Sequence, residues 1–223
     1  MPRVPHLRIT GDNQVAEAVV LLLHGGTPDS FVPVRAYDPA VLRMLPFGSS
    51  VVRAGQKRIA LATLRYAVRG WNGVQQSPLE DARWAINQIG ERFGDLPIGL
   101  IGHSMGGRVA LRVADHVGRS GGVRSLAALA PWLPNGEPAP DLDPHETLLL
   151  AHGTSDRTTD PARTFELAAK LAAEGVDVEL VKFPGARHSM LFPARPWHDL
   201  VAGFMARTLL APAPDGPGAG QPH

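Results

Sequence analysis

The sequence contains no cysteine among its 223 residues. A disulfide bond, a thiolate nucleophile and a thiolate metal site are therefore all excluded. The chain also lacks a large charge of either sign, because 22 lysines and arginines are balanced by 21 aspartates and glutamates. Without a strong basic or acidic field, nucleic acids and anionic membranes are disfavoured as main partners.

Long apolar runs are absent as well. The N-terminal stretch MPRVPHLRITGDNQVAEA has no apolar region of the kind found in a signal peptide. The longest clean apolar run near it, AVVLLL, is far shorter than the ~20 residues that a membrane-spanning helix needs. We therefore expect a cytoplasmic protein, with no membrane partner.

The length and composition predict one domain followed by a tail. A hydrophobic content of 44% is enough for a full core, and the size predicts a single domain over residues 1–210. The last stretch, APAPDGPGAGQPH, is rich in proline and glycine and has little to bury. Residues 211–223 are therefore expected to form a disordered tail.

Apolar runs of strand length recur along the chain, each bounded by turn residues. Most are continuously apolar rather than alternating, which is typical of strands covered on both faces in a parallel sheet. They occupy residues 6–9, 18–24, 58–66, 97–103, 124–130, 147–152 and 176–183. Helix-like segments lie between them at 77–93, 105–117, 160–175 and 195–210. This order predicts an α/β fold with a mostly parallel sheet of about seven strands and helices on both faces.

Two of these helices have recognisable ends. Ser77, with Pro78 and Glu80 after it, has the pattern of an N-cap and capping box. Asp160 stands before a proline in the same way, and Gly175 is a suitable stop for that helix.

Two other segments are less regular. A helix is expected somewhere in 38–54, although Pro46 and Gly48 interrupt its pattern. The connector PWLPNGEPAPDLDPHE, residues 131–146, is short and rich in proline. It is too short for a lid domain over an active site.

The heptapeptide IGHSMGG, residues 101–107, lies where an apolar strand should become a helix. A serine on so sharp a turn has an exposed hydroxyl, and Gly102 and Gly106 avoid collisions in the turn. The N-terminus of the following helix also favours negative charge at this point. Ser104 is therefore a candidate nucleophile, with a simple helix cap as the alternative.

A serine nucleophile needs a base, normally a histidine held by a carboxylate. His188 follows the last apolar strand, and Asp156 lies in the turn after the strand before it. The order Ser104, Asp156, His188 is the one expected when all three lie beyond the carboxyl ends of an open α/β sheet. Asp141 and Asp143, in the proline-rich connector, are the alternative carboxylates.

The remaining histidines near these positions have structural interpretations. His103 points away from the neighbouring serine on an extended backbone and is expected to pack in the core. His24 and His152 end strands next to glycines and are expected to be buried and hydrogen-bonded. No pair of histidines has metal-ligand spacing such as H-E-x-x-H, so we expect no metal site.

An oxyanion hole requires two N–H donors. The backbone of Met105, directly after the serine, is one candidate. The second should come from the glycine-rich loop after the strand 18–24, where Gly26 is favoured and Thr27 is the alternative. No G-x-x-x-x-G-K-[ST] or G-x-G-x-x-G motif accompanies this loop, which disfavours phosphate binding there.

The chain resembles the α/β-hydrolase fold serine hydrolases, in particular lidless esterases and dienelactone-hydrolase-like members. The resemblance rests on LLLHGG (21–26), GHSMGG (102–107), HGTSD (152–156) and ARHSM (186–190). It implies that Ser104 attacks a carbonyl, that His188 acts as base and then acid, and that Asp156 orients the imidazole. It implies no cofactor. Dienelactone-hydrolase-like members usually carry a cysteine nucleophile, whereas this chain has a serine.

The resemblance predicts hydrolysis of small-molecule carboxylic esters or thioesters with small to medium acyl groups. An acyltransferase, a peptidase, a cofactor-free peroxidase and a non-catalytic binding protein on the same fold are the alternatives. Trp132, Trp71 and Leu191 follow strands at the expected active edge and are candidates for substrate contact. Their alternative role is to anchor loops to the core.

Overall fold

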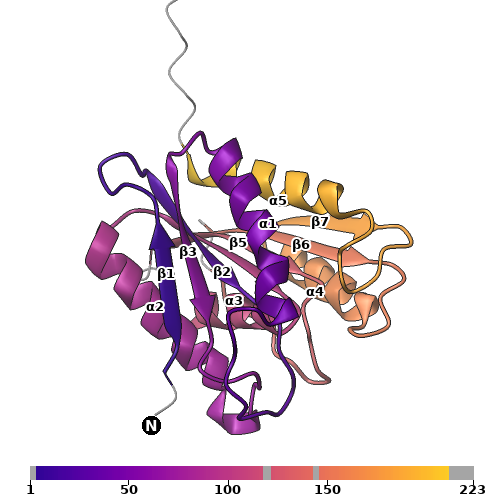
Figure 1. The fold of residues 1–223 in the computed structure, drawn as a ribbon. Coiled ribbons are helices and arrows are strands. Elements are labelled where there is room, and N and C mark those ends of the chain that lie inside the picture. The colour runs from indigo at the N-terminus through magenta and orange to yellow at the C-terminus, as the bar shows by residue number, and fades with distance from the viewer. Residues whose placement is uncertain (1–3, 118–121, 143–145, 211–223) are drawn as a thin grey trace, which may run out of the picture.

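The computed structural model describes residues 4–117, 122–142 and 146–210. These residues form a seven-stranded sheet in the order β1-β3-β2-β4-β5-β6-β7 (Figure 1). Only β1 is antiparallel to its neighbour, and the other pairings are parallel. The predicted mostly parallel sheet is confirmed, whereas the predicted tail at 211–223 lies outside the described residues. The strands are β1 (His6–Thr10), β2 (Ala18–Leu23), β3 (Ile59–Arg65), β4 (Ile98–His103), β5 (Val123–Leu129), β6 (Thr147–Gly153) and β7 (Asp177–Phe183).

Helices cover the sheet on both faces, as predicted. Helices α1 and α5 pack against each other on one face, and α2, α3 and α4 contribute to the core on the other (Figure 1). A short 3₁₀ turn, η1, precedes α2. The bounds are α1 (Pro39–Ala54), η1 (Gly73–Gln75), α2 (Ser77–Phe93), α3 (Met105–Val117), α4 (Pro161–Ala173) and α5 (Ala194–Leu209).

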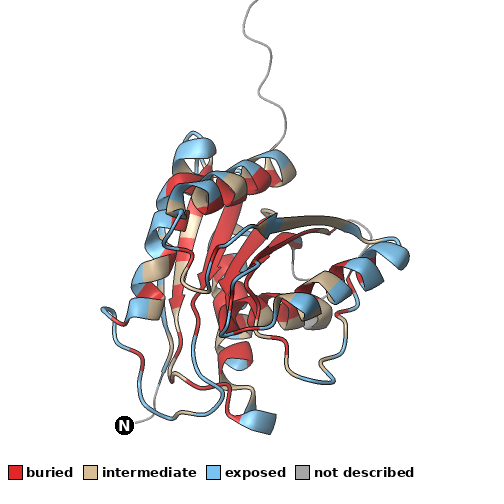
Figure 2. Ribbon diagram, turned by 90° about the vertical axis from the view of Figure 1, so that its right-hand side faces the viewer, coloured by how far each residue is buried: buried red, intermediate tan, exposed pale blue. Residues whose placement is uncertain are grey.

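The continuous apolar sequence of the central strands follows from these two layers. In β2, Leu21 and Leu23 pack toward α2 and α3, whereas Val20 and Leu22 pack toward α1 and α5. All four side chains are buried. Figure 2 shows the sheet as a buried layer between helices whose outer surfaces are exposed. Each such side chain contributes roughly 2 kcal/mol to folding, so neither face of the strand tolerates a polar residue.

The parallel strands bring distant loops to one edge of the sheet. Strands β2, β4 and β5 run side by side, followed by β6 and β7, all in the same direction. Their carboxyl ends lead into the loops that carry Gly26, Ser104, Asp156 and His188. The candidate site residues therefore meet at one edge although they are far apart in the sequence.

Helix α1 runs without a break through the two residues that interrupt its sequence pattern. Pro46 and Gly48 both lie inside the helix. Pro46 is exposed and can face solvent. Gly48 is buried against the sheet, where a Cβ would come within 2.6 Å of Leu61 and 3.0 Å of Leu22. Tertiary packing thus keeps this segment helical against the local preference of both residues.

The predicted capping box at Ser77 is wrong. The N-cap of α2 is Gln76, in the left-handed region at φ 45°, and Ser77 is already helical. The hydroxyl of Ser77 instead accepts a hydrogen bond from the side-chain amide of Asn72, at 3.1 Å. The predicted N-cap at Asp160 is confirmed, because its carboxylate accepts the backbone N–H of Ala162 at 3.0 Å.

The sequence predicts neither a lid nor a membrane-spanning helix, and the described residues can be compared with both expectations. The connector after β5 contains no helix or strand over 130–142, and no lid is built from this part of it. Within the ranges that the structure describes, every helix is too short or too polar to cross a membrane.

Replacing Pro46 by alanine is expected to stabilise the protein. Proline has no N–H to donate to the carbonyl of Leu42, a defect that costs about 3 kcal/mol in a helix interior. Allowing for the greater freedom of the unfolded chain, Pro46→Ala should gain about 2 kcal/mol and raise Tm by about 4–8 °C. Thermal unfolding followed by circular dichroism measures this shift.

Pro39→Ala is the matched control, because Pro39 occupies the first turn of the same helix, where no N–H is needed. Its Tm should stay the same or fall slightly. If Pro46→Ala were no more stable than Pro39→Ala, the proposed defect in the helix would be refuted.

Candidate active site

Ser104 lies on a strained turn between β4 and α3. Its φ is 56°, in the left-handed region that non-glycine residues rarely adopt. The backbone of the turn is fixed on both sides, because the N–H of Ser104 donates to the carbonyl of Leu129 at 2.9 Å. The N–H of Trp132 in turn donates to the carbonyl of Ser104 at 3.0 Å. Neighbouring backbone thus holds the serine in a conformation that it would not adopt alone.

The glycines around Ser104 are required by close backbone contacts. A Cβ at Gly102 would overlap the backbone of Gly106, and a Cβ at Gly106 would overlap the carbonyl oxygen of Leu23. Both overlaps involve backbone atoms, which cannot move aside as a flexible side chain can. The sequence prediction that these glycines permit a tight turn therefore has a direct steric basis.

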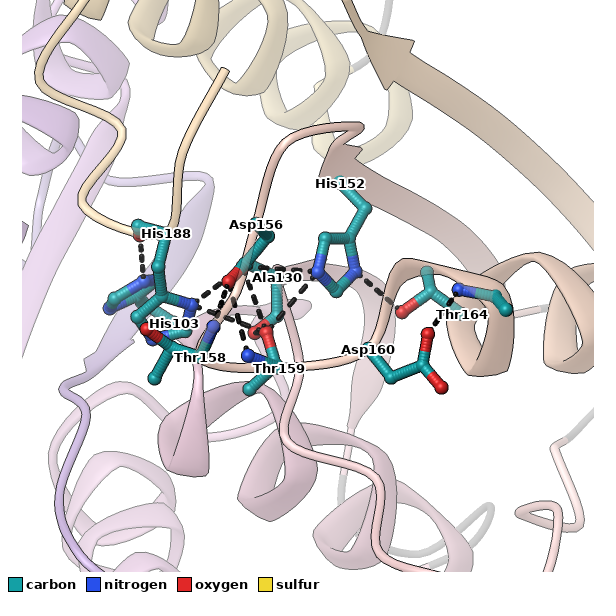
Figure 3. Close-up of polar contacts among 10 residues, drawn as sticks. His103, Ala130, His152, Asp156, Thr158, Thr159, Asp160, Thr164 and His188 are labelled. Atoms are coloured by element: carbon teal, nitrogen blue, oxygen red, sulfur yellow. Dashed lines mark hydrogen bonds and ion pairs between the residues drawn. The ribbon is translucent and has the colours of Figure 1, made fainter. Parts of the chain in front are cut away.

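His188 and Asp156 form a short hydrogen bond. The Nδ1–H of His188 donates to Oδ2 of Asp156 at 2.7 Å (Figure 3). Because a carboxylate only accepts, Nδ1 must carry the proton, which leaves Nε2 of the neutral ring as an acceptor. The Asp156 side chain is fully buried, whereas 16% of the His188 side chain is exposed. This is the arrangement of a histidine base oriented by a buried carboxylate.

The Asp156 carboxylate accepts further hydrogen bonds. Its Oδ1 accepts the backbone N–H groups of Thr158 and Thr159 at 2.7 and 3.1 Å, and Oδ2 accepts the Thr159 hydroxyl at 2.9 Å. Burial alone would raise the pKa of Asp156. The hydrogen bonds from His152, His188 and the two threonine N–H groups outweigh burial and hold this pKa well below its usual value.

His152 also contacts the same carboxylate, a role that the sequence analysis did not assign. Its Nε2–H donates to Oδ2 of Asp156 at 3.1 Å, and its Nδ1 accepts the hydroxyl of Thr164 at 2.7 Å (Figure 3). The ring is completely buried, as expected for this histidine. The i, i+4 spacing in HGTSD is the only signal in the sequence for this contact.

His103 contacts His188 through both its ring and a hydrogen bond. Its Nε2–H donates to the backbone carbonyl of His188 at 2.9 Å, and the two ring centroids are 4.7 Å apart (Figure 3). Burial, together with the nearby His188 and Arg43, lowers the pKa of His103 to about 3, so its ring is neutral. The prediction that His103 packs in the core is correct, and the packing partner is the loop that carries His188.

Ser104 and His188 line one open cleft of about 370 Å³, together with Gly25, Gly26 and Thr27. No hydrogen bond joins Ser104 to His188 in the described part of the chain. Catalytic hydrogen bonds are often long before a substrate binds, and a rotation of the serine side chain changes this distance. The cleft therefore presents a hydroxyl, an imidazole and a glycine-rich loop to the same space.

The backbone distinguishes the two candidates for the second oxyanion donor. The N–H of Thr27 donates to the carbonyl of Arg69 at 3.0 Å and is therefore occupied. The N–H of Gly26 has no acceptor among the described residues. A Cβ at Gly26 would overlap both the carbonyl of Arg69 and the side chain of Met105. These contacts favour Gly26 and explain why a glycine stands there.

The candidate substrate-contacting residues lie outside this cleft. Trp71 and Trp132 pack around Arg108, whose guanidinium is 3.8 and 4.8 Å from their ring centroids. Arg108 is also paired with Glu137 at 2.6 Å. Leu191 is 51% exposed. None of these three residues lines the cleft that contains Ser104, and their contact with substrate stays a prediction.

The alternative carboxylates can also be placed. Asp141 is exposed, and its backbone N–H donates to Asp115 at 3.0 Å. Asp143 lies outside the described residues. For a metal ion, the described ranges contain no cluster of three or more histidine, aspartate or glutamate side chains that could hold one.

A mostly parallel sheet with a serine on a strained strand-to-helix turn and a buried Asp–His pair defines an α/β-hydrolase. Residues 62–205 match the dienelactone hydrolase family, and the chain belongs to that family. No curated protein matches the sequence.

Solved structures similar to this chain include an esterase from Pyrobaculum calidifontis, with 15% identity, a TM-score of 0.71, and 93% of this chain and 82% of that one covered. A lidless serine hydrolase from Xanthomonas campestris has 18% identity and a TM-score of 0.66, covering 94% and 91%. Est1E from Butyrivibrio proteoclasticus, bound to ferulic acid, has 14% identity and a TM-score of 0.66, covering 92% and 95%. At such identities these likenesses establish the fold alone.

Neutral, buried histidines should make the fold sensitive to acid. His24 donates from Nδ1 to the carbonyl of Gly25 at 2.6 Å and accepts the N–H of Tyr66 at Nε2, and burial lowers the pKa of His24 to about 4. The unfolded chain takes up this proton near the ordinary value of 6.5, so stability is complete above that pH and falls as the pH decreases. The loss is about 2 kcal/mol per such histidine at pH 5.

Urea unfolding at pH 7 and pH 5 measures this loss. In His24→Gln, which cannot titrate, the difference in unfolding free energy between the two pH values should be smaller than in the wild type. An equal difference in the two proteins would show that His24 does not carry the effect.

Proposed function

We propose that this chain is a serine hydrolase that cleaves carboxylic esters or thioesters of small to medium acyl groups through an acyl-serine intermediate. The observation that carries this proposal is the 2.7 Å hydrogen bond from His188 Nδ1 to the buried Asp156, beside a cleft that also exposes Ser104. This pair leaves His188 Nε2 free to act as a base toward the serine.

In the first step, Nε2 of His188 accepts the proton of the Ser104 hydroxyl while the serine oxygen bonds to the substrate carbonyl carbon. The resulting imidazolium is stabilised by Asp156, whose low pKa keeps its charge negative throughout. The imidazolium then gives its proton to the departing alcohol or thiol, and an acyl-serine remains. Water repeats the sequence, releasing the carboxylic acid and restoring Ser104.

The oxyanion formed in each half-reaction needs hydrogen-bond donors. The backbone N–H groups of Met105 and Gly26 are the ones that we assign to it. Met105 begins α3, so the positive end of the helix dipole also stabilises negative charge there. The N–H of Gly26 has no acceptor in the part of the chain that the structure describes, which supports its role.

The shape of the cleft supports a substrate of limited size. The hollow beside Ser104 measures about 370 Å³ and is open to solvent. In the described residues of the connector after β5, no helix or strand covers it. A hollow of this volume can seat a short acyl chain.

Ser104→Ala should abolish acyl transfer to the enzyme. Without the nucleophile, kcat for p-nitrophenyl acetate should fall by about 10³-fold or more, because the members of a triad act as a unit. A fluorophosphonate probe should label the wild type and leave Ser104→Ala unlabelled. Ser49→Ala, an exposed serine on α1, is the control that should keep both labelling and turnover. Equal labelling of Ser104→Ala and wild type would rule out this nucleophile.

Gly26→Ala should damage the oxyanion site. The added methyl group displaces the loop from Met105 and Arg69, so kcat should fall about 10²–10³-fold, the effect of losing one oxyanion donor. Steady-state kinetics on a p-nitrophenyl ester measure the change, with thermal unfolding as a check on folding. Gly203→Ala is the control, because a Cβ there meets open space. An unchanged kcat in folded Gly26→Ala would exclude Gly26 from this role.

A further inference from the structure

A second hollow adjoins the cleft that contains Ser104. It measures about 540 Å³ and is open to solvent. Three arginines and several small polar residues form its lining, and His188 forms part of the wall. Arg43, Thr158 and His188 line both hollows, so the two are continuous around the imidazole. We call this second hollow the arginine cleft; its lining consists of Arg43, Arg157, Arg187, Ser155, Thr158, Gly185, His188 and Ser189.

The three arginines come from separate parts of the chain. Arg43 projects from α1, whereas Arg157 and Arg187 belong to the loops after β6 and β7. Arg157 directly follows Asp156 in the sequence, and Arg187 directly precedes His188. Folding therefore gathers three positive charges at the side of the active site formed by His188.

Several arginines elsewhere in the protein pair with carboxylates. Examples are Arg58 with Glu17 at 2.5 Å and Arg69 with Asp38 at 2.9 Å. In the described residues, by contrast, Arg43, Arg157 and Arg187 form no ion pair.

Arg43 has a buried hydrogen-bond donor without an acceptor among the described residues. Its Nε is buried and has no hydrogen-bond partner in the described structure. A buried donor without an acceptor is unfavourable, and a charged one more so. No aspartate or glutamate lines the arginine cleft, and both oxygens of nearby Asp156 already accept hydrogen bonds from other groups. The cleft thus offers charge and donors but supplies no anion of its own.

The position of the arginine cleft indicates which part of the substrate it would face in the proposed reaction. It shares His188 with the cleft beside Ser104, but neither Ser104 nor Gly26 lines it. In the proposed mechanism, the imidazolium of His188 protonates the departing group, which must therefore lie on the side of His188. The acyl oxygen lies instead against the N–H groups of Gly26 and Met105.

We propose that the arginine cleft binds an anionic group, a carboxylate or a phosphate, on the leaving alcohol or thiol of the substrate. This inference rests on the proposed hydrolase function. Guanidinium groups bind both anions through paired N–H donors, and the hydroxyls of Ser155, Thr158 and Ser189 add further donors. The natural substrate is then an ester or thioester whose leaving group is charged.

Matched phenyl acetates test this inference. The enzyme is assayed with 4-carboxyphenyl acetate and with its neutral methyl ester, 4-(methoxycarbonyl)phenyl acetate. The neutral ester has the more acidic phenol as its leaving group, so the intrinsic difference in reactivity opposes the expected preference. The wild type should favour the anionic ester by about tenfold or more in kcat/KM, and added salt should reduce this preference. A third substrate, 4-acetoxyphenyl phosphate, shows whether phosphate or carboxylate is preferred.

Arg43→Gln and Arg187→Gln should each lower the preference for the anionic ester, measured as the ratio of kcat/KM for the anionic and the neutral ester, at least several-fold. Because Arg187 is exposed, its variant keeps the test valid if Arg43→Gln fails to fold. Arg195→Gln is the matched control, since its side chain is 91% exposed on α5 and it removes the same charge outside the cleft. The control should keep the wild-type preference.

The outcomes separate this inference from the proposed function. Hydrolysis of both esters at equal rates by the wild type, or a preference unaltered in both arginine variants, would overturn the anion-binding role while leaving the hydrolase intact. If Arg195→Gln lost the preference for the anionic ester as much as the two cleft variants, the preference would arise from the overall charge of the protein. That result would also overturn the anion-binding role. No hydrolysis of any ester and no fluorophosphonate labelling would overturn the proposed function, and the inference with it.

Discussion

The carboxylate of Asp156 is the group on which the arrangement of the site depends. It is buried, and it accepts hydrogen bonds from His188, His152, the Thr159 hydroxyl and two backbone N–H groups. A buried charge is stable only when it is paired in this way. The same bonds join the loop after β6 to the loop after β7. Orientation of the imidazole and stability of this edge of the sheet therefore have one cause.

A steric constraint complements this electrostatic one at Ser104, the proposed nucleophile. Ser104 is held at a positive φ by hydrogen bonds to the backbone around it, and Gly102 and Gly106 leave no room for a side chain. The strain is tolerated because β4 is buried between two helical layers and cannot relax. Gly26, across the cleft, is under the same steric constraint, because only a residue without a side chain lets its loop approach Met105 this closely.

Charge is distributed unevenly around the reacting groups. Gly26 lines the cleft beside Ser104, and Arg157 and Arg187 line the hollow next to it, while Arg43 and His188 border both. Within the described ranges these three arginines form no ion pair. A molecule with a formal net charge of only +1 thus concentrates positive charge beside His188. Overall composition conceals this local field, because the compensating carboxylates are paired with arginines elsewhere.

Local pattern determined much of this protein: the strands and most helix positions follow from apolar periodicity and turn residues, and the chain order of Ser104, Asp156 and His188 follows from strand ends. Tertiary structure decided the rest. Packing keeps α1 helical through Pro46, and Asn72 engages the hydroxyl of Ser77 that local pattern assigned to a cap. The bond from Thr27 to Arg69, the bond from His103 to the carbonyl of His188, and the gathered arginines join residues that are distant in the sequence. Such contacts depend on how strands align, which spacing along one chain does not encode.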